Sequence, residues 1–163
     1  MMIHDDPAVL VDLKIECTFN HLTRQGREGA STLDSLVEPD SATLSSTKPD
    51  FPAENCIDGE TDGPAFDENS KTGKLCHTEP EVAPWIALHY NTPVNVQRVK
   101  LFNRIDCCGD RTKNVQVRIS NELPSSGSEM FTGGFLFGRF DGPATNGQHI
   151  VITGKKQLSI IHL

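Results

Sequence analysis

The chain has 163 residues, 36% hydrophobic and 23% charged, a size and composition typical of one globular domain with some additional tail. It carries 15 Lys and Arg against 22 Asp and Glu, a formal charge of −7, which disfavours general attraction to nucleic acid or anionic lipid. No apolar run approaches the roughly 18–20 residues of a membrane-spanning helix. We therefore expect neither membrane insertion nor nucleic-acid binding, and any export signal would lie outside this sequence.

The first half of the chain contains few signals of regular structure. The first 32 residues, with one apolar stretch at 8–15, read as a linker or the remnant of an upstream segment. Residues 31–73 are dense in Ser, Thr, Asp, Glu, Gly and Pro, which favours turns. Long ordered loops of this kind usually carry function or a metal.

The second half contains the strand signals. Segments that have strand-like alternation or β-branched content lie at 85–90, 94–102, 115–119, 134–140, 149–153 and 158–163. No segment keeps a helical period over a dozen residues. Short strands between Gly, Pro and Asn turns predict an all-β fold, a β-sandwich or jelly roll.

The densest local pattern follows the strand predicted at 94–102, where two arginines flank an acid and two adjacent cysteines: Arg104, Asp106, Cys107, Cys108 and Arg111. A guanidinium presents five donors in one plane, so two arginines could bind the oxygens of a sugar, a carboxylate or a phosphate. The carboxylate between them could hold a guanidinium in place. The two cysteines could close a small disulfide ring that exposes an apolar plate, be reduced, or bond elsewhere.

The spacing of this motif extends back to a histidine. His77 is followed by 26 residues, Arg104, one residue, Asp106, four residues and Arg111. This pattern, with its surrounding sequence, resembles the F-type lectins, a fucose-binding family, over about residues 33–163. The resemblance implies a β jelly roll with a shallow pocket and places a single F-type lectin domain at 33–163.

The resemblance also implies roles for individual residues. His77, Arg104 and Arg111 would hydrogen-bond α-L-fucose at the end of a glycan, with Asp106 in the same motif. A vicinal disulfide between Cys107 and Cys108 would pack on the sugar, and Phe66 is the candidate for the apolar niche of the fucose methyl group. The expected partners are fucosylated glycans or glycoproteins, bound through several sites together in a homo-oligomer or a multidomain chain.

A structural Ca²⁺ is a further implication of the resemblance. Asn55, Asp58 and Glu60 match the first calcium-binding segment of the family, and Ca²⁺ takes six to eight oxygen ligands. In the last predicted strand, Ile161 and His162 stand where the family has Cys and Glu, so one carboxylate ligand and one disulfide of the family are missing.

The five cysteines fix no connectivity. A bond between Cys56 and Cys76, with Cys17 left unpaired, is one arrangement that this sequence permits. The cysteines together favour an oxidising, extracellular compartment.

Two other classes of function were weighed. A discoidin-like protein- or lipid-binding adhesion module with a decayed sugar site would need exposed apolar loop tips, for which the stretch 133–140 is the candidate. We find no pair of carboxylates in an acid/base context and no nucleophile motif, so we expect no enzyme activity.

Overall fold

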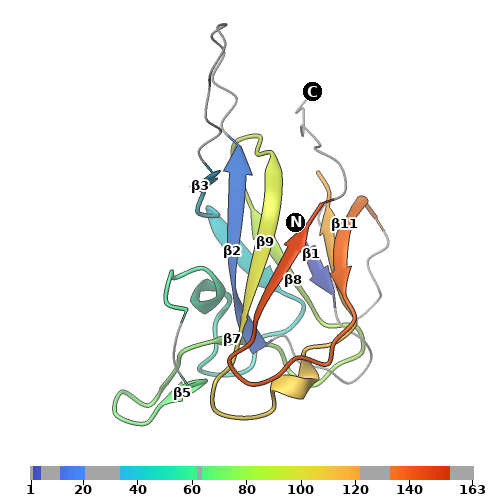
Figure 1. Ribbon diagram of the computed structural model, residues 1–163. Coiled ribbons are helices and arrows are strands. Elements are labelled where there is room, and N and C mark those ends of the chain that lie inside the picture. The colour runs from blue at the N-terminus through green and yellow to red at the C-terminus, as the bar shows by residue number, and fades with distance from the viewer. Residues whose placement is uncertain (1, 5–11, 21–33, 62–63, 122–132, 155–163) are drawn as a thin grey trace, which may run out of the picture.

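This computed structural model describes residues 2–4, 12–20, 34–61, 64–121 and 133–154, which form two antiparallel sheets and one small hairpin (Figure 1). The first sheet has the order β11 (Phe135–Phe140), β10 (Val115–Ile119), β1 (Met2–His4), β8 (Trp85–His89) and β4 (Ser41–Leu44). The second has the order β12 (His149–Thr153), β9 (Val96–Asn103), β2 (Asp12–Asn20) and β3 (Asp34–Leu36), with β7 (Cys76–His77) also paired to β2. The expected all-β sandwich is confirmed.

The strands β8 to β12 coincide with five of the six segments that the sequence predicts. The sixth, 158–163, lies outside the described residues. Residues from the inward faces of these strands form the main core, and Ile86, Val99, Leu101, Val115 and Val117 are at most 1% exposed. Burial of such side chains contributes about 1.5–3 kcal/mol each, so the strand-rich second half of the chain supplies most of the described core.

The first 32 residues are not only a linker, which corrects our expectation. Met2–His4 lies between β8 and β10, and Asp12–Asn20 pairs with β9 along its length. These strands satisfy backbone donors and acceptors that would otherwise leave open edges in the middle of each sheet. The alternation of Leu13, Ile15 and Cys17 with polar residues was a strand signal, concealed by the polar sequence around it.

The turn-rich region 34–73 contains short elements. β4 buries Ala42 and Leu44 and exposes the residues between them. It is followed by the 3₁₀ helix η1 (Ala53–Cys56) and by a two-stranded hairpin of β5 (Phe66–Asp67) and β6 (Thr72–Gly73), which protrudes at the lower left of Figure 1.

Candidate functional site

A loop that follows β9 carries the arginine and cysteine motif, and Asn103 anchors it. The Asn103 side chain is buried, and its Nδ2 donates to the carbonyl oxygens of Gly109, at 2.9 Å, and Thr145, at 3.0 Å. Its Oδ1 accepts from Thr112 Oγ1 at 3.0 Å and from the Arg104 backbone N–H at 3.2 Å. One buried amide therefore ties together the start and the end of the loop and the neighbouring segment at Thr145.

Within this loop, Asp106 orients Arg104. Arg104 Nε donates to Asp106 Oδ1 at 2.7 Å and Nη2 donates to Oδ2 at 2.8 Å, a two-point pairing that fixes the plane of the guanidinium. The backbone N–H groups of Cys107 and Ala65 also donate to this carboxylate, at 2.9 and 3.4 Å. Hydrogen bonding from Arg104 is the main reason that the pKa of Asp106 falls from 3.8 to about 2, so the carboxylate is ionised at neutral pH.

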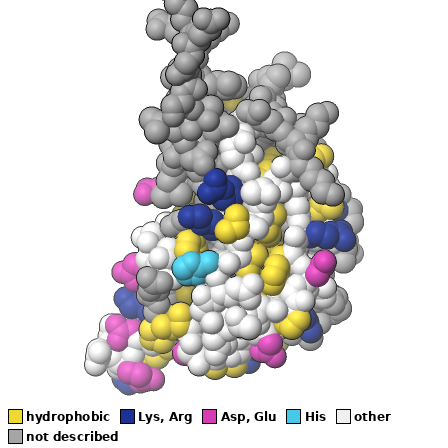
Figure 2. Space-filling view, in the orientation of Figure 1, with side chains coloured by type: hydrophobic (Ala, Val, Ile, Leu, Met, Phe, Trp, Pro, Cys, Tyr) yellow, Lys and Arg dark blue, Asp and Glu magenta, His cyan; other side chains and the backbone are white. Residues whose placement is uncertain are grey.

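Asp106 and Phe66 line the same open cavity of about 570 Å³, together with Glu60, Pro64, Asp67, Glu68, Asn69 and Lys74. Phe66 comes from β5 and is half-buried. Charged side chains of both signs surround apolar surface at the hairpin end of the molecule in Figure 2. The cavity thus combines an aromatic ring with hydrogen-bond acceptors, a pairing that suits the apolar face and the hydroxyl groups of a sugar.

His77 lies on the other side of β2 from this loop. Asp12 of β2 is opposite His77, while Leu13 is opposite both Cys76 and Asn103. Two inter-strand spacings therefore separate the His77 strand from β9, a distance of about 10 Å between their backbones.

The His77 imidazole itself is buried, with 3% of the residue exposed. Its Nδ1 is hydrogen-bonded to the Thr78 carbonyl oxygen, and its ring centroid is 5.4 Å from that of Phe51. Phe51 in turn lies 6.1 Å from the ring of Phe66. Aromatic packing therefore connects His77 to the wall of the cavity.

The cysteine pair and Arg111 complete the loop. Cys107 and Cys108 lie side by side with their Sγ atoms 2.7 Å apart and are not joined in this structure. The vicinal disulfide stays a prediction. Cys108 has a φ of 58° and begins the 3₁₀ helix η2 (Gly109–Arg111), at whose end Arg111 is exposed. The change of backbone direction at Cys108 determines where Arg111 lies.

The residues expected to bind calcium lie around a second cavity. Asn55, Asp58 and Glu60 line a space of about 400 Å³, together with Asp50, Pro52, Thr72, Gly73 and Lys74. Asp58 Oδ1 accepts the backbone N–H of Glu60 at 3.0 Å, which shapes the turn between them. The three residues expected to bind calcium thus line one cavity, and calcium binding there stays a prediction.

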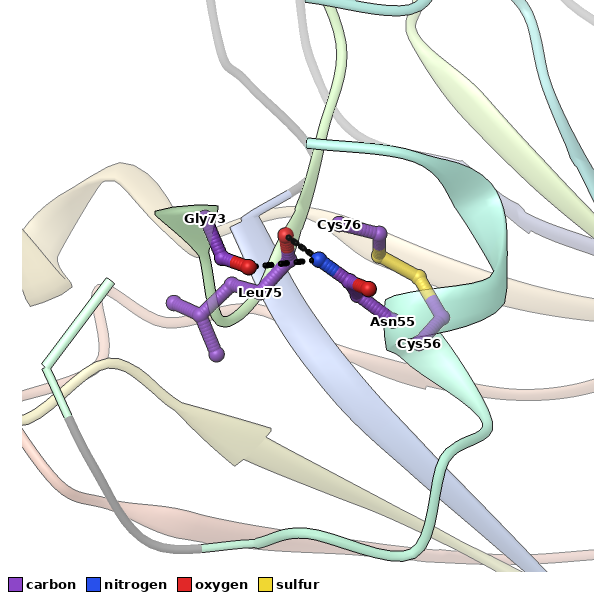
Figure 3. Close-up of a disulfide and its surroundings, with 5 residues drawn as sticks. All are labelled: Asn55, Cys56, Gly73, Leu75 and Cys76. Carbon is purple, nitrogen blue, oxygen red and sulfur yellow. Dashed lines mark hydrogen bonds between the residues drawn. A yellow bond between two sulfur atoms is a disulfide. The ribbon is translucent and has the colours of Figure 1, made fainter. Parts of the chain in front are cut away.

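A disulfide follows Asn55 of this cavity in the chain. Cys56 and Cys76 are bonded, with their Cα atoms 5.0 Å apart, so the arrangement that the sequence permits is the one formed. Beside it, Asn55 Nδ2 donates to the carbonyl oxygens of Gly73, at 2.9 Å, and Leu75, at 3.2 Å (Figure 3). The protein itself thus joins η1 to the strand that leads to His77.

A cation of the protein itself also lines the second cavity. Lys74 Nζ lies 3.7 Å from Glu60 Oε2. Among the described residues, no three His, Cys, Asp or Glu side chains form a group that could hold a metal ion. The ammonium group would compete with a divalent ion for the Glu60 carboxylate.

The stretch considered for the alternative adhesion function forms a strand. Residues 135–140 are β11, at the edge of the first sheet. Phe135 and Leu136 are 41% and 36% exposed, and the neighbouring Val151 on β12 is 54% exposed. The apolar surface there belongs to two sheet edges, which differs from the loop tips that the alternative requires.

Two residues important to the site were missed by sequence reasoning. Asn103 directly precedes Arg104, but nothing in its position predicts four hydrogen bonds across the loop. Lys74 lies three residues before His77, where no motif marks it.

Comparison with known proteins shows what part of the chain is similar to. Residues 55–133 match the family model described as NedA-like, galactose-binding domain. None of the helices in the described part of the chain has the length and apolar character to cross a membrane. The β-sandwich and this match, which covers just under half of the chain, show a similarity to galactose-binding domains.

The chain is also similar in sequence to three named proteins. The chain is 32% identical over 85 residues to a pentraxin fusion protein of Xenopus laevis, an alignment that covers 52% of this chain and 19% of that protein. It is 31% identical over 75 residues to a fucolectin of Anguilla anguilla (46% of this chain, 44% of that protein) and 33% identical over 75 residues to fucolectin-4 of Anguilla japonica (46% and 38%). The chain thus spans less than half the length of each, and no solved structure matched it. The resemblance to F-type lectins is confirmed, and the aligned part of the chain is F-type lectin-like.

Proposed function

We propose that the chain is a non-catalytic lectin domain that binds terminal α-L-fucose on glycans. The observation that carries the proposal is the Arg104–Asp106 pair beside the cavity that Phe66 lines, at the motif that the sequence shares with fucose-binding lectins. The match to relatives named fucolectins over nearly half of the chain supports it.

In this proposal, the two arginines donate hydrogen bonds to the sugar. Arg104 is oriented by Asp106, so little side-chain entropy remains to be lost when a hydroxyl or ring oxygen binds. Arg111 is exposed on the same loop. Because Arg104 and Arg111 lie on one short segment, their guanidinium groups can donate to a ligand that is rich in oxygen acceptors.

Other residues of the loop and the hairpin provide apolar contact. Phe66 would accept the methyl group of fucose, and Cys107 with Cys108 would cover an apolar face of the ring. His77, buried against Phe51, would form the floor of the site.

The context of the domain follows from the same chemistry. Hydrogen bonds to neutral hydroxyls contribute about 0.5–1.5 kcal/mol each, so a single domain binds weakly and gains avidity from several copies on one partner. The Cys56–Cys76 disulfide suits an oxidising compartment, and we place the protein outside the cell, bound to fucosylated glycoproteins.

The experiment is retention on L-fucose agarose and calorimetric titration of the wild type, Arg104→Ala and Arg139→Ala. Arg139 is an exposed arginine on β11, so its variant controls for the loss of one surface charge. We expect saturable fucose binding that excess D-galactose does not abolish. Arg104→Ala should weaken it by about 10–100-fold because charge-assisted hydrogen bonds are lost, and Arg139→Ala should leave it unchanged.

Two results would contradict the proposal. One is unchanged fucose retention by Arg104→Ala with a wild-type circular dichroism spectrum. The other is a folded wild-type protein that shows no saturable heat with L-fucose.

A further inference from the structure

We propose that the Lys74 ammonium group acts as the cation of the loop at Asn55, Asp58 and Glu60, and that this loop is therefore stable without calcium. The inference is independent of sugar binding. It rests on the position of Lys74, on the way the surrounding segments are joined, and on the charges around the second cavity.

The position of Lys74 is between two cavities. Lys74 and Glu60 line both the cavity that contains Phe66 and the cavity of about 400 Å³ at Asn55. Lys74 Nζ lies 3.7 Å from Glu60 Oε2, and the two side chains are 37% and 59% exposed. The ion pair therefore forms a wall shared by both cavities, with the ammonium beside the Glu60 carboxylate that a metal ion would use.

The surrounding segments are joined without a metal. Asn55 Nδ2 holds the carbonyl oxygens of Gly73 and Leu75, and the Cys56–Cys76 disulfide lies next to it (Figure 3). These links connect η1 to the segment 73–76, which contains Lys74. A bound ion would repeat a connection that covalent and hydrogen bonds already make.

The charges around the second cavity also oppose the binding of Ca²⁺. A Ca²⁺ site gains its affinity from the number of carboxylates that face the ion. Here the Lys74 ammonium stands against Glu60, and Ca²⁺ would have to displace it at a cost in electrostatic repulsion. Removal of the ammonium should free the Glu60 carboxylate and make the cavity available to a divalent ion.

The test is thermal unfolding of the wild type, Lys74→Met and Lys71→Met, each in EDTA, in 10 mM CaCl₂ and in 10 mM MgCl₂. Met keeps the apolar stem and introduces no oxygen ligand. Lys71 is the matched control, because it pairs with Glu68 at 2.8 Å on the same hairpin and lines neither cavity. MgCl₂ controls for ionic strength.

We expect the wild type and Lys71→Met to show the same Tm in EDTA and in CaCl₂. Lys74→Met should unfold about 1–3 °C below the wild type in EDTA. CaCl₂ should raise the Tm of that variant by about 3–6 °C, as for a site with a Kd near 1 mM, and MgCl₂ should do less.

A wild-type Tm that rises in CaCl₂ as much as that of Lys74→Met would overturn the proposal, as would a folded Lys74→Met that does not respond to CaCl₂. Should Lys74→Met fail to fold, calorimetric titration of the wild type with CaCl₂ decides. An absence of saturable heat supports the proposal, and a Kd below about 1 mM overturns it. None of these measurements depends on fucose binding. The proposal about Lys74 can therefore be refuted without affecting the proposed lectin function, and the reverse also holds.

Discussion

Replacement of Asn103 tests whether one buried amide holds the arginine loop. The side chain makes four hydrogen bonds at 2.9 to 3.2 Å, and the residue is 4% exposed. Loss of a buried partner costs about 0.5–1.5 kcal/mol per bond. We therefore expect Asn103→Ala to lower the free energy of unfolding by about 3 kcal/mol, allowing for partial relaxation and access of water.

The assay is urea and thermal unfolding followed by circular dichroism. For a domain of this size, about 3 kcal/mol corresponds to a fall in Tm of about 6–12 °C. Asn103→Asp keeps the shape but places a carboxylate oxygen where Nδ2 now faces two carbonyl oxygens, so at neutral pH it should be at least as destabilising. Asn91→Ala, at an exposed asparagine, is the control.

A fall in Tm of less than about 2 °C for Asn103→Ala would refute this reasoning. It would mean that the contacts of the loop with the segment at Thr145 are sufficient without the amide. Such a result would also weaken the argument that the position of Arg104 is determined by Asn103.

Three further predictions follow from contacts of the described residues. Reduction of Cys56–Cys76, which are separated by 20 positions, should cost about 3 kcal/mol through the entropy of the unfolded chain, measurable as a lower urea midpoint in dithiothreitol. The pKa of Asp106 is lowered to about 2 from 3.8, so its pairing with Arg104 contributes stability that is present above about pH 4 and lost as the pH falls toward 2. Because the pair is partly exposed, we expect at most about 1 kcal/mol, and Asp106→Asn should remove this acid dependence from denaturant unfolding curves at pH 2–5. Gly73→Ala would place Cβ 2.3 Å from a backbone carbonyl oxygen, so it should lower the Tm, and an unchanged Tm would show that the hairpin can shift.

The strands of the second half of the chain were predictable because their side chains carry the signal locally. In β10, Val115, Val117 and Ile119 alternate with polar residues, and all three are buried. Period-two alternation follows from strand geometry alone and needs no information about neighbours.

The strands of the first half depend more on their partners. β1 has only three residues, and β4 has four. Such segments become strands because β8 and β10 offer unpaired backbone groups on either side. The sequence around them shows no local pattern strong enough to distinguish them from a linker or a loop.

The sequence by itself determined the class of fold, the motif of His77, Arg104, Asp106 and Arg111, and the group of residues around the second cavity, because spacing and residue type are properties of the chain. Only the tertiary structure decided that His77 is buried across β2 from the arginine loop and that Lys74 stands beside Glu60. These outcomes depend on which distant segments meet, since burial and charge pairing are set by neighbours in space.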